Sequence, residues 1–76
     1  MANLDGKKVK QMRTALGLSR EDCTWLAAER GLRLPASVVI RVEGGQAVTR
    51  SDHLYALAVV LDVAIEDLYQ QQEATA

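Results

Sequence analysis

The chain of 76 residues contains little of several residue types that organise other small proteins. It has one cysteine, Cys23, and one histidine, His53, so the sequence allows no internal disulfide and no cysteine or histidine metal cluster. No apolar run approaches the roughly 20 residues that span a bilayer, and residues 1–5 lack the basic and apolar regions of a signal peptide. We therefore expect a cytoplasmic protein that binds no cofactor, metal ion or membrane.

Aromatic residues and proline are equally scarce, whereas aliphatic residues are plentiful. Phenylalanine is absent and Pro35 is the single proline. This composition favours helices over a sheet. A chain of this length buries only about 60% of the surface that its unfolded form exposes, so a second copy would add stability. The composition predicts one small all-α domain.

Charge is distributed unevenly along the chain. All nine basic residues lie at or before position 50, together with five acidic residues, whereas the segment from Ser51 onward has five acidic residues and no basic one. One end of the molecule could therefore attract a polyanion while the other repels it. The alternative interpretation is a set of solvated surface charges distributed by chance.

Capping residues and apolar spacing predict the first three helices. Asp5 can cap a helix through residues 7–16 that ends at Gly17, with Val9, Met12 and Leu16 facing inward. Ser19 and Asp22 form a possible capping box for a second helix, which ends at Gly31. Its inward residues should be Cys23, Leu26 and Ala27.

A third helix is predicted over residues 35–43, because Pro35 suits a first turn and two glycines follow Glu43. This prediction overrides the strand propensity of the β-branched residues in 38–42. Thr49 or Ser51 can cap a fourth helix, and a fifth short one covers residues 65–69. The inward stripe of the fourth helix is Leu54, Leu57, Ala58 and Leu61. We expect a flexible tail at 1–4, a domain at 5–69 and a polar tail at 70–76.

With these elements placed, the chain resembles the lambda-repressor, Cro and Xre family of helix-turn-helix proteins. The matching segments are 9–13, 16–22, 39–45, 54–63 and 65–68. The resemblance implies a five-helix, lambda-repressor-like domain whose third helix enters the DNA major groove. Cys23, Thr24 and Asp62 replace a leucine, an alanine and a glycine of the family pattern. The connection between the second and third helices is also longer, which predicts an extra turn at 28–30 and a wide loop at 31–34.

The third helix carries the candidate base-reading residues. If Val39, Val42 and Glu43 face the core, a rotation of about 100° per residue turns Ser37 and Arg41 outward. Val38 and Ile40 would then flank them. The family's base-reading positions are occupied here by Ala36, Ser37, Ile40 and Arg41. Arginine can donate two hydrogen bonds to guanine, although Arg41 could also be a solvated surface residue.

The resemblance further implies the supporting contacts. Arg20, Gly45, Gln46 and Arg50 would contact phosphates, and Lys8 is an additional candidate by its charge. Arg13 and Glu43 would form a structural ion pair. The expected dimer interface lies at the C-terminal helices, where apolar residues exceed what a small core needs: Tyr55, Val59, Val60, Ile65 and Tyr69.

Three residues that occur once need separate interpretation. Trp25 lies off the apolar stripe of the second helix, so it either packs on Leu32 and Leu34 or stands exposed as an anchor for a partner. Cys23 is expected to be a small core residue. His53 is expected to be an ordinary surface or boundary residue.

These observations predict a DNA-binding transcriptional regulator, most simply a repressor, that binds a palindromic operator as a homodimer. The alternative is a protein-interaction module on the same fold, such as an antitoxin that binds a toxin or another regulatory protein, with weak DNA binding. The sequence shows no nucleophile paired with a base and no phosphate-binding glycine loop, so we do not expect an enzyme.

Overall fold

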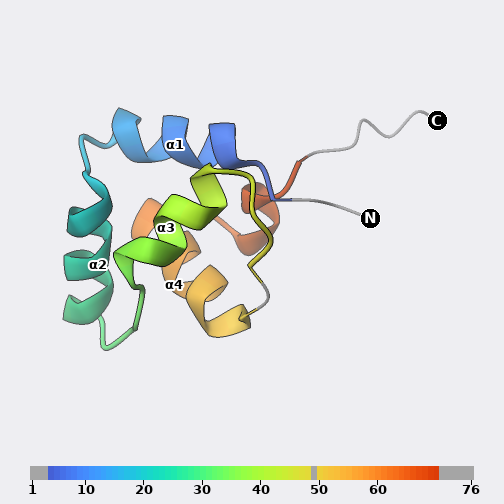
Figure 1. Cartoon of the computed structure of the whole chain (residues 1–76). Coiled ribbons are helices and arrows are strands. Elements are labelled where there is room, and N and C mark those ends of the chain that lie inside the picture. The colour runs from blue at the N-terminus through green and yellow to red at the C-terminus, as the bar shows by residue number, and fades with distance from the viewer. Residues whose placement is uncertain (1–3, 49, 71–76) are drawn as a thin grey trace.

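The computed structural model describes residues 4–48 and 50–70, and these form a small all-α fold. The α-helices are α1 (Gly6–Ala15), α2 (Arg20–Glu29), α3 (Ala36–Glu43) and α4 (Ser51–Leu61), and η1 (Ile65–Leu68) is a 3-10 helix. The helices α1 and α2 both contact α3. In the view of Figure 1, α4 lies behind α3. The prediction of an all-α fold is confirmed, including a helix where residue propensity alone favours a strand.

The first two helices begin and end where their capping residues predict. The Asp5 carboxylate accepts a hydrogen bond from the Lys8 backbone N–H at 3.1 Å. Ser19 and Asp22 form the reciprocal capping box, with hydrogen bonds of 3.0 and 2.9 Å. Gly17 follows α1 with a φ of 72°, a left-handed conformation that glycine adopts without steric cost. The helix α2 extends through Glu29, which accounts for most of the predicted extra turn.

The fourth helix begins differently from the prediction. Ser51 is its first helical residue and Arg50 occupies the N-cap position, without a side-chain cap. Ser51 is therefore not the cap, because its backbone already has helical geometry; the other candidate, Thr49, lies outside the described residues. At the other end Asp62 adopts φ 57° and ψ 46°. Aspartate thus fills the left-handed position where the family pattern has glycine.

A single core joins all five elements. The predicted α4 stripe is buried, and so is Leu34, which anchors the long connection between α2 and α3 with 1% of its surface exposed. Cys23 is fully buried as predicted, and burial raises the pKa of its thiol. Leu16 is 53% exposed, contrary to the predicted stripe; it is the C-cap residue of α1, one position beyond the last helical residue.

The two ends of the described chain meet beside η1. Leu4 forms an isolated antiparallel bridge with Tyr69, and the Asp5 N–H donates to the Leu68 carbonyl at 2.8 Å. Leu4 is also half-buried against the core. The prediction of a flexible tail at 1–4 is therefore wrong for Leu4, which backbone pairing holds in place. The remaining residues of the two predicted tails, except Gln70, lie outside the described residues.

Thr24 gives a first test of the packing. Its Oγ1 is buried and has no hydrogen-bond partner among the described residues. Because an unsatisfied buried hydroxyl destabilises a protein, we expect Thr24→Val to raise the free energy of unfolding by about 1 kcal/mol in urea denaturation. Thr14→Val is the control, because the Thr14 hydroxyl donates to the Lys10 carbonyl at 2.9 Å and is exposed. An equal gain in both variants would show that the Thr24 hydroxyl is not the cause.

Candidate nucleic-acid interface

One face of α3 is open to solvent. Ser37, Ile40 and Arg41 are exposed, and their spacing of three and four residues places them in one stripe on the helix. Ala36 is half-buried at the start of the helix. Three of the four residues predicted to read bases therefore share an exposed surface.

Val38 does not flank that stripe as predicted. It is 7% exposed, and it lines a small pocket together with Ala47, Val48 and His53. The segment after α3 returns over this side of the helix, so α3 is covered by more than its two neighbouring helices. The exposed apolar surface of α3 is consequently smaller than the sequence predicts. Its one large exposed apolar side chain is Ile40, which is 52% exposed.

The C-terminal end of α3 is fixed to α1 and α2 by a buried charge cluster. Glu43 Oε2 accepts from Arg13 Nε at 2.6 Å, and Glu43 Oε1 accepts from Arg13 Nη2 at 3.0 Å. Arg20 Nη2 lies 3.2 Å from the same Oε1. Arg13 also donates to the Leu18 carbonyl at 2.7 Å, so it joins the turn between α1 and α2 to the end of α3. The ion pair implied by the resemblance is present.

Burial and charge act in opposite directions on this cluster. Burial favours the neutral form of Glu43, but the hydrogen bond and charge of Arg13, with help from Arg20, lower the pKa of Glu43 below its ordinary value. The hydrogen bond to Glu43 raises the pKa of Arg13 despite desolvation. The Glu43 side chain is 3% exposed, whereas that of Arg20 is 39% exposed. Arg20 therefore pairs with Glu43, and only part of its side chain is exposed for a contact with a phosphate.

A second basic cluster lies beside the open face of α3. Arg41, Arg50 and His53 line a pocket of about 240 Å³ whose remaining walls are Val38, Ala47 and Val48. Arg50 forms an exposed ion pair with Asp52, with Nη2 and Oδ2 2.7 Å apart. The hydrogen bond from Arg50 lowers the pKa of Asp52. A predicted base-reading residue and a predicted phosphate contact thus come together here.

His53 in this cluster is more buried than predicted. It is 8% exposed and faces the pocket, although we expected an ordinary surface or boundary residue. Its position could have indicated this, because His53, Leu57 and Val60 follow the four- and three-residue spacing of one helix face. The sequence prediction therefore missed a residue of the basic pocket.

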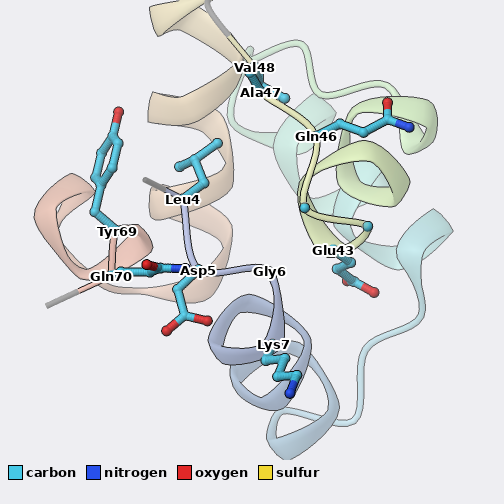
Figure 2. Close-up of a pocket in the computed structure, with 12 residues that line it drawn as sticks. Leu4, Asp5, Gly6, Lys7, Glu43, Gln46, Ala47, Val48, Tyr69 and Gln70 are labelled. Carbon is cyan, nitrogen blue, oxygen red and sulfur yellow. The ribbon is translucent and has the colours of Figure 1, made fainter. Parts of the chain in front are cut away.

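Other predicted phosphate contacts lie around a larger groove of about 780 Å³. Gly45 and Gln46 form one wall with neighbouring residues of the segment after α3, and the chain around Asp5 forms the opposite wall with Tyr69 and Gln70, as Figure 2 shows. Lys7 also lines the groove. Lys8 does not line it; its backbone N–H is used by the Asp5 cap. The structure thus distributes the predicted phosphate contacts over several places rather than one patch.

The predicted dimer surface needs correction at Val60, which is 9% exposed and belongs to the core. It lies on the same buried side of α4 as Leu57, so a partner could not reach it without opening the domain. Ile65 and Tyr69 are half-buried, and Tyr55 is 52% exposed. Val59 is half-buried as well, so an interface at this end would depend on Tyr55, Val59, Ile65 and Tyr69.

Trp25 is 72% exposed, so the interpretation that it packs over the long loop is wrong. Cys23 and Ala27, two residues to either side, both face the core, and the helical rotation therefore turns Trp25 to the opposite side. Leu34 fills the space beneath the loop instead. Trp25 is the largest side chain that the described part of the chain leaves exposed.

Comparisons with protein-family models, with curated proteins and with solved structures find no match to this chain. Residues 4–48 and 50–70 contain no group of three or more histidine, cysteine or acidic side chains placed to hold a metal ion. Over the same ranges, none of the helices has both the length and the apolar character needed to cross a bilayer.

Proposed function

We propose that this protein is a DNA-binding transcriptional regulator of the lambda-repressor-like kind, with α3 lying in the major groove. The observation that carries the proposal is the exposed stripe of Ser37, Ile40 and Arg41 beside Arg50 and His53. Arginine on such a stripe can donate to guanine O6 and N7, and Ile40 can contact a thymine methyl group. Arg50, which lines a pocket together with Arg41, can contact one of the phosphates that fix the helix in position.

The proposed assembly is a homodimer on a palindromic operator, acting most simply as a repressor that blocks a promoter. Two copies related by two-fold symmetry would place their α3 helices about one DNA turn, ~34 Å, apart. Tyr55, Ile65 and Tyr69 would contribute apolar surface to the dimer. Selecting bound sequences from a random DNA pool tests this directly. A palindromic consensus is expected, and a pool that shows no enrichment would contradict sequence-specific binding.

A second candidate function is an interaction module for a toxin or another regulatory protein. The exposure of Trp25 favours it, because tryptophan is enriched among the residues that dominate protein interfaces. A salt titration on mixed-sequence DNA separates the two functions. Phosphate contacts make affinity fall as salt rises, so binding that is absent even at low salt would favour the interaction module.

Arg41→Ala tests the assignment of α3 as the recognition helix. We expect a loss of about 1–3 kcal/mol on the selected sequence and a relaxed preference at one base pair in each half-site, because the guanine contact is removed. The measurement is a binding titration against the selected duplex and its single-base variants. Arg30→Ala, which removes an exposed charge at the end of α2, is the control. If Arg41→Ala weakens binding equally on every sequence, Arg41 contacts a phosphate and not a base.

A further inference from the structure

We infer that the exposed side of α2 binds a protein segment that presents arginine side chains, with one guanidinium stacked on Trp25 between the carboxylates of Glu21 and Glu29. This inference goes beyond DNA binding by α3 and does not depend on it. It gives the interaction module, the second candidate function, a defined surface and a partner of defined chemistry.

Trp25 lies in the middle of a solvent-exposed side of α2, at one edge of the fold in Figure 1. Its side chain is 72% exposed. Residues three and four positions apart are neighbours on a helix surface. The four neighbours of Trp25 by this spacing are all exposed: Glu21, Asp22, Ala28 and Glu29. A large aromatic side chain is therefore open to solvent among neighbours of which three are acidic.

The stability of α2 does not account for this composition. Tryptophan is a poorer helix former than alanine, and an indole that is largely exposed gains little from packing within the domain. Glu21 suits the first turn, but Glu29 is the last helical residue, where the helix dipole disfavours a carboxylate. Neither carboxylate forms an ion pair within residues 4–48 and 50–70. Trp25 and Glu29 thus occupy positions that local helix stability does not favour.

Helix geometry places the two glutamates on either side of the indole. Glu21 lies four residues before Trp25 and Glu29 four residues after it, so each is displaced along the axis by about 6 Å and rotated by about 40°. A cation above the indole is then close to a carboxylate in both directions. Arginine fits this arrangement, because its planar guanidinium stacks on aromatic rings and donates two hydrogen bonds to a carboxylate.

The same charges argue against two other occupants. Carboxylates repel the phosphates of DNA, so this surface does not suit a nucleic acid. A second copy of the chain that packed through α2 would bring like charges together. In an antiparallel pair of helices centred on Trp25, Glu21 of one copy would face Glu29 of the other. Charge complementarity therefore selects a basic protein segment.

A short peptide of alternating arginine and alanine is the probe, and Trp25 is the reporter because it is the only tryptophan in the chain. We expect the peptide to change the fluorescence of Trp25 in a saturable manner at low salt. A second peptide, with lysine in place of every arginine, carries the same charge. It should bind about threefold to tenfold more weakly, because an ammonium group does not stack on the indole as a guanidinium does.

Variants are compared by the anisotropy of the labelled arginine peptide. Trp25→Leu keeps an apolar side chain but removes the aromatic ring, and it should weaken binding by about tenfold. Glu29→Gln should weaken binding by about threefold, the size of an exposed ion pair. Glu66→Gln, which removes an exposed acidic residue on η1, is the charge-matched control and should bind as the wild type does. Trp25 and Glu29 are exposed, so both variants should keep the wild-type urea midpoint.

Either equal affinity for the two peptides or an unchanged affinity of Trp25→Leu would overturn the inference, because the peptide would then bind by net charge alone. An equal loss in Glu66→Gln and Glu29→Gln would overturn it for the same reason. The selection of DNA sequences tests α3 separately. If that selection succeeds and the arginine peptide does not bind, the inference fails while the proposed DNA binding stands.

Discussion

Glu43→Ala is expected to lower the free energy of unfolding by about 3–5 kcal/mol. The substitution leaves Arg13, whose side chain is 8% exposed, and the partly buried Arg20 without their shared counter-charge. A domain of this size has a total stability of roughly 0.05–0.15 kcal/mol per residue, so the loss would remove a large part of it. Urea denaturation at neutral pH measures the effect.

The control is Asp52→Asn, which breaks an ion pair whose two side chains are 65% and 55% exposed. Solvent screens such a pair, so this variant should unfold almost as the wild type does. A similar loss in both variants would show that the burial of Glu43 does not determine the cost.

Acid should reproduce part of the Glu43 effect. The pKa of Glu43 is lowered in the folded protein, so the ion cluster contributes fully above the ordinary glutamate pKa of about 4.3 and is lost as the pH falls through the lower folded value. The wild type should therefore lose more stability than Glu43→Ala when the pH is taken from neutral to strongly acidic. Equal losses would indicate that other carboxylates dominate acid unfolding.

The features that the sequence predicted well depend on neighbouring residues. The Asp5 cap, the Ser19–Asp22 capping box and the α4 stripe each involve residues at most a few positions apart, and all three are present. Such local patterns are encoded by helix geometry alone. The Arg13–Glu43 pair spans thirty positions, and the spacing of residues could not have indicated it; it came from the family resemblance.

The errors have two different causes. Val38 was expected on the surface, but the segment after α3, which the sequence does not place, covers it. Val60 and His53 were also expected at or near the surface, although their spacing from Leu57 indicates the buried side of α4. Of the two alternatives for Trp25, packing over the long loop is wrong, and the side chain is exposed because the helical rotation turns it away from Cys23 and Ala27.

These corrections narrow the candidate interface. Because Val38 is buried, it does not contribute to the exposed face of α3. Ser37 and Arg41 therefore make up a larger fraction of the surface that a partner could contact. The exposed α3 face is therefore more polar than the sequence alone predicts, and this is consistent with the proposed DNA interface rather than with an apolar protein partner at that surface.

Gly6 gives the second large expected effect, and its sign is opposite to what helix propensity predicts. Replacing a glycine inside a helix by alanine usually stabilises the protein by about 0.5–1 kcal/mol. At Gly6, however, a Cβ atom would overlap the Val42 carbonyl oxygen and lie 2.8 Å from that of Glu43. Both obstacles are backbone atoms, which cannot rotate away. We therefore expect Gly6→Ala to destabilise the protein by about 3 kcal/mol, at the upper end of the range for overpacking.

The effect of Gly6→Ala should extend to the candidate interface, because the contact sets how closely α1 approaches the end of α3. Separating these helices would also strain the Arg13–Glu43 pair, so DNA affinity should fall together with stability. Gly17→Ala is the control. Its φ of 72° makes a side chain strained, but no atom lies within 4 Å of the added Cβ, so the cost should be only about 1–2 kcal/mol, with DNA binding unchanged. If Gly6→Ala instead raises the urea midpoint, the predicted overlap of the added Cβ atom with the carbonyl oxygens at the end of α3 does not occur.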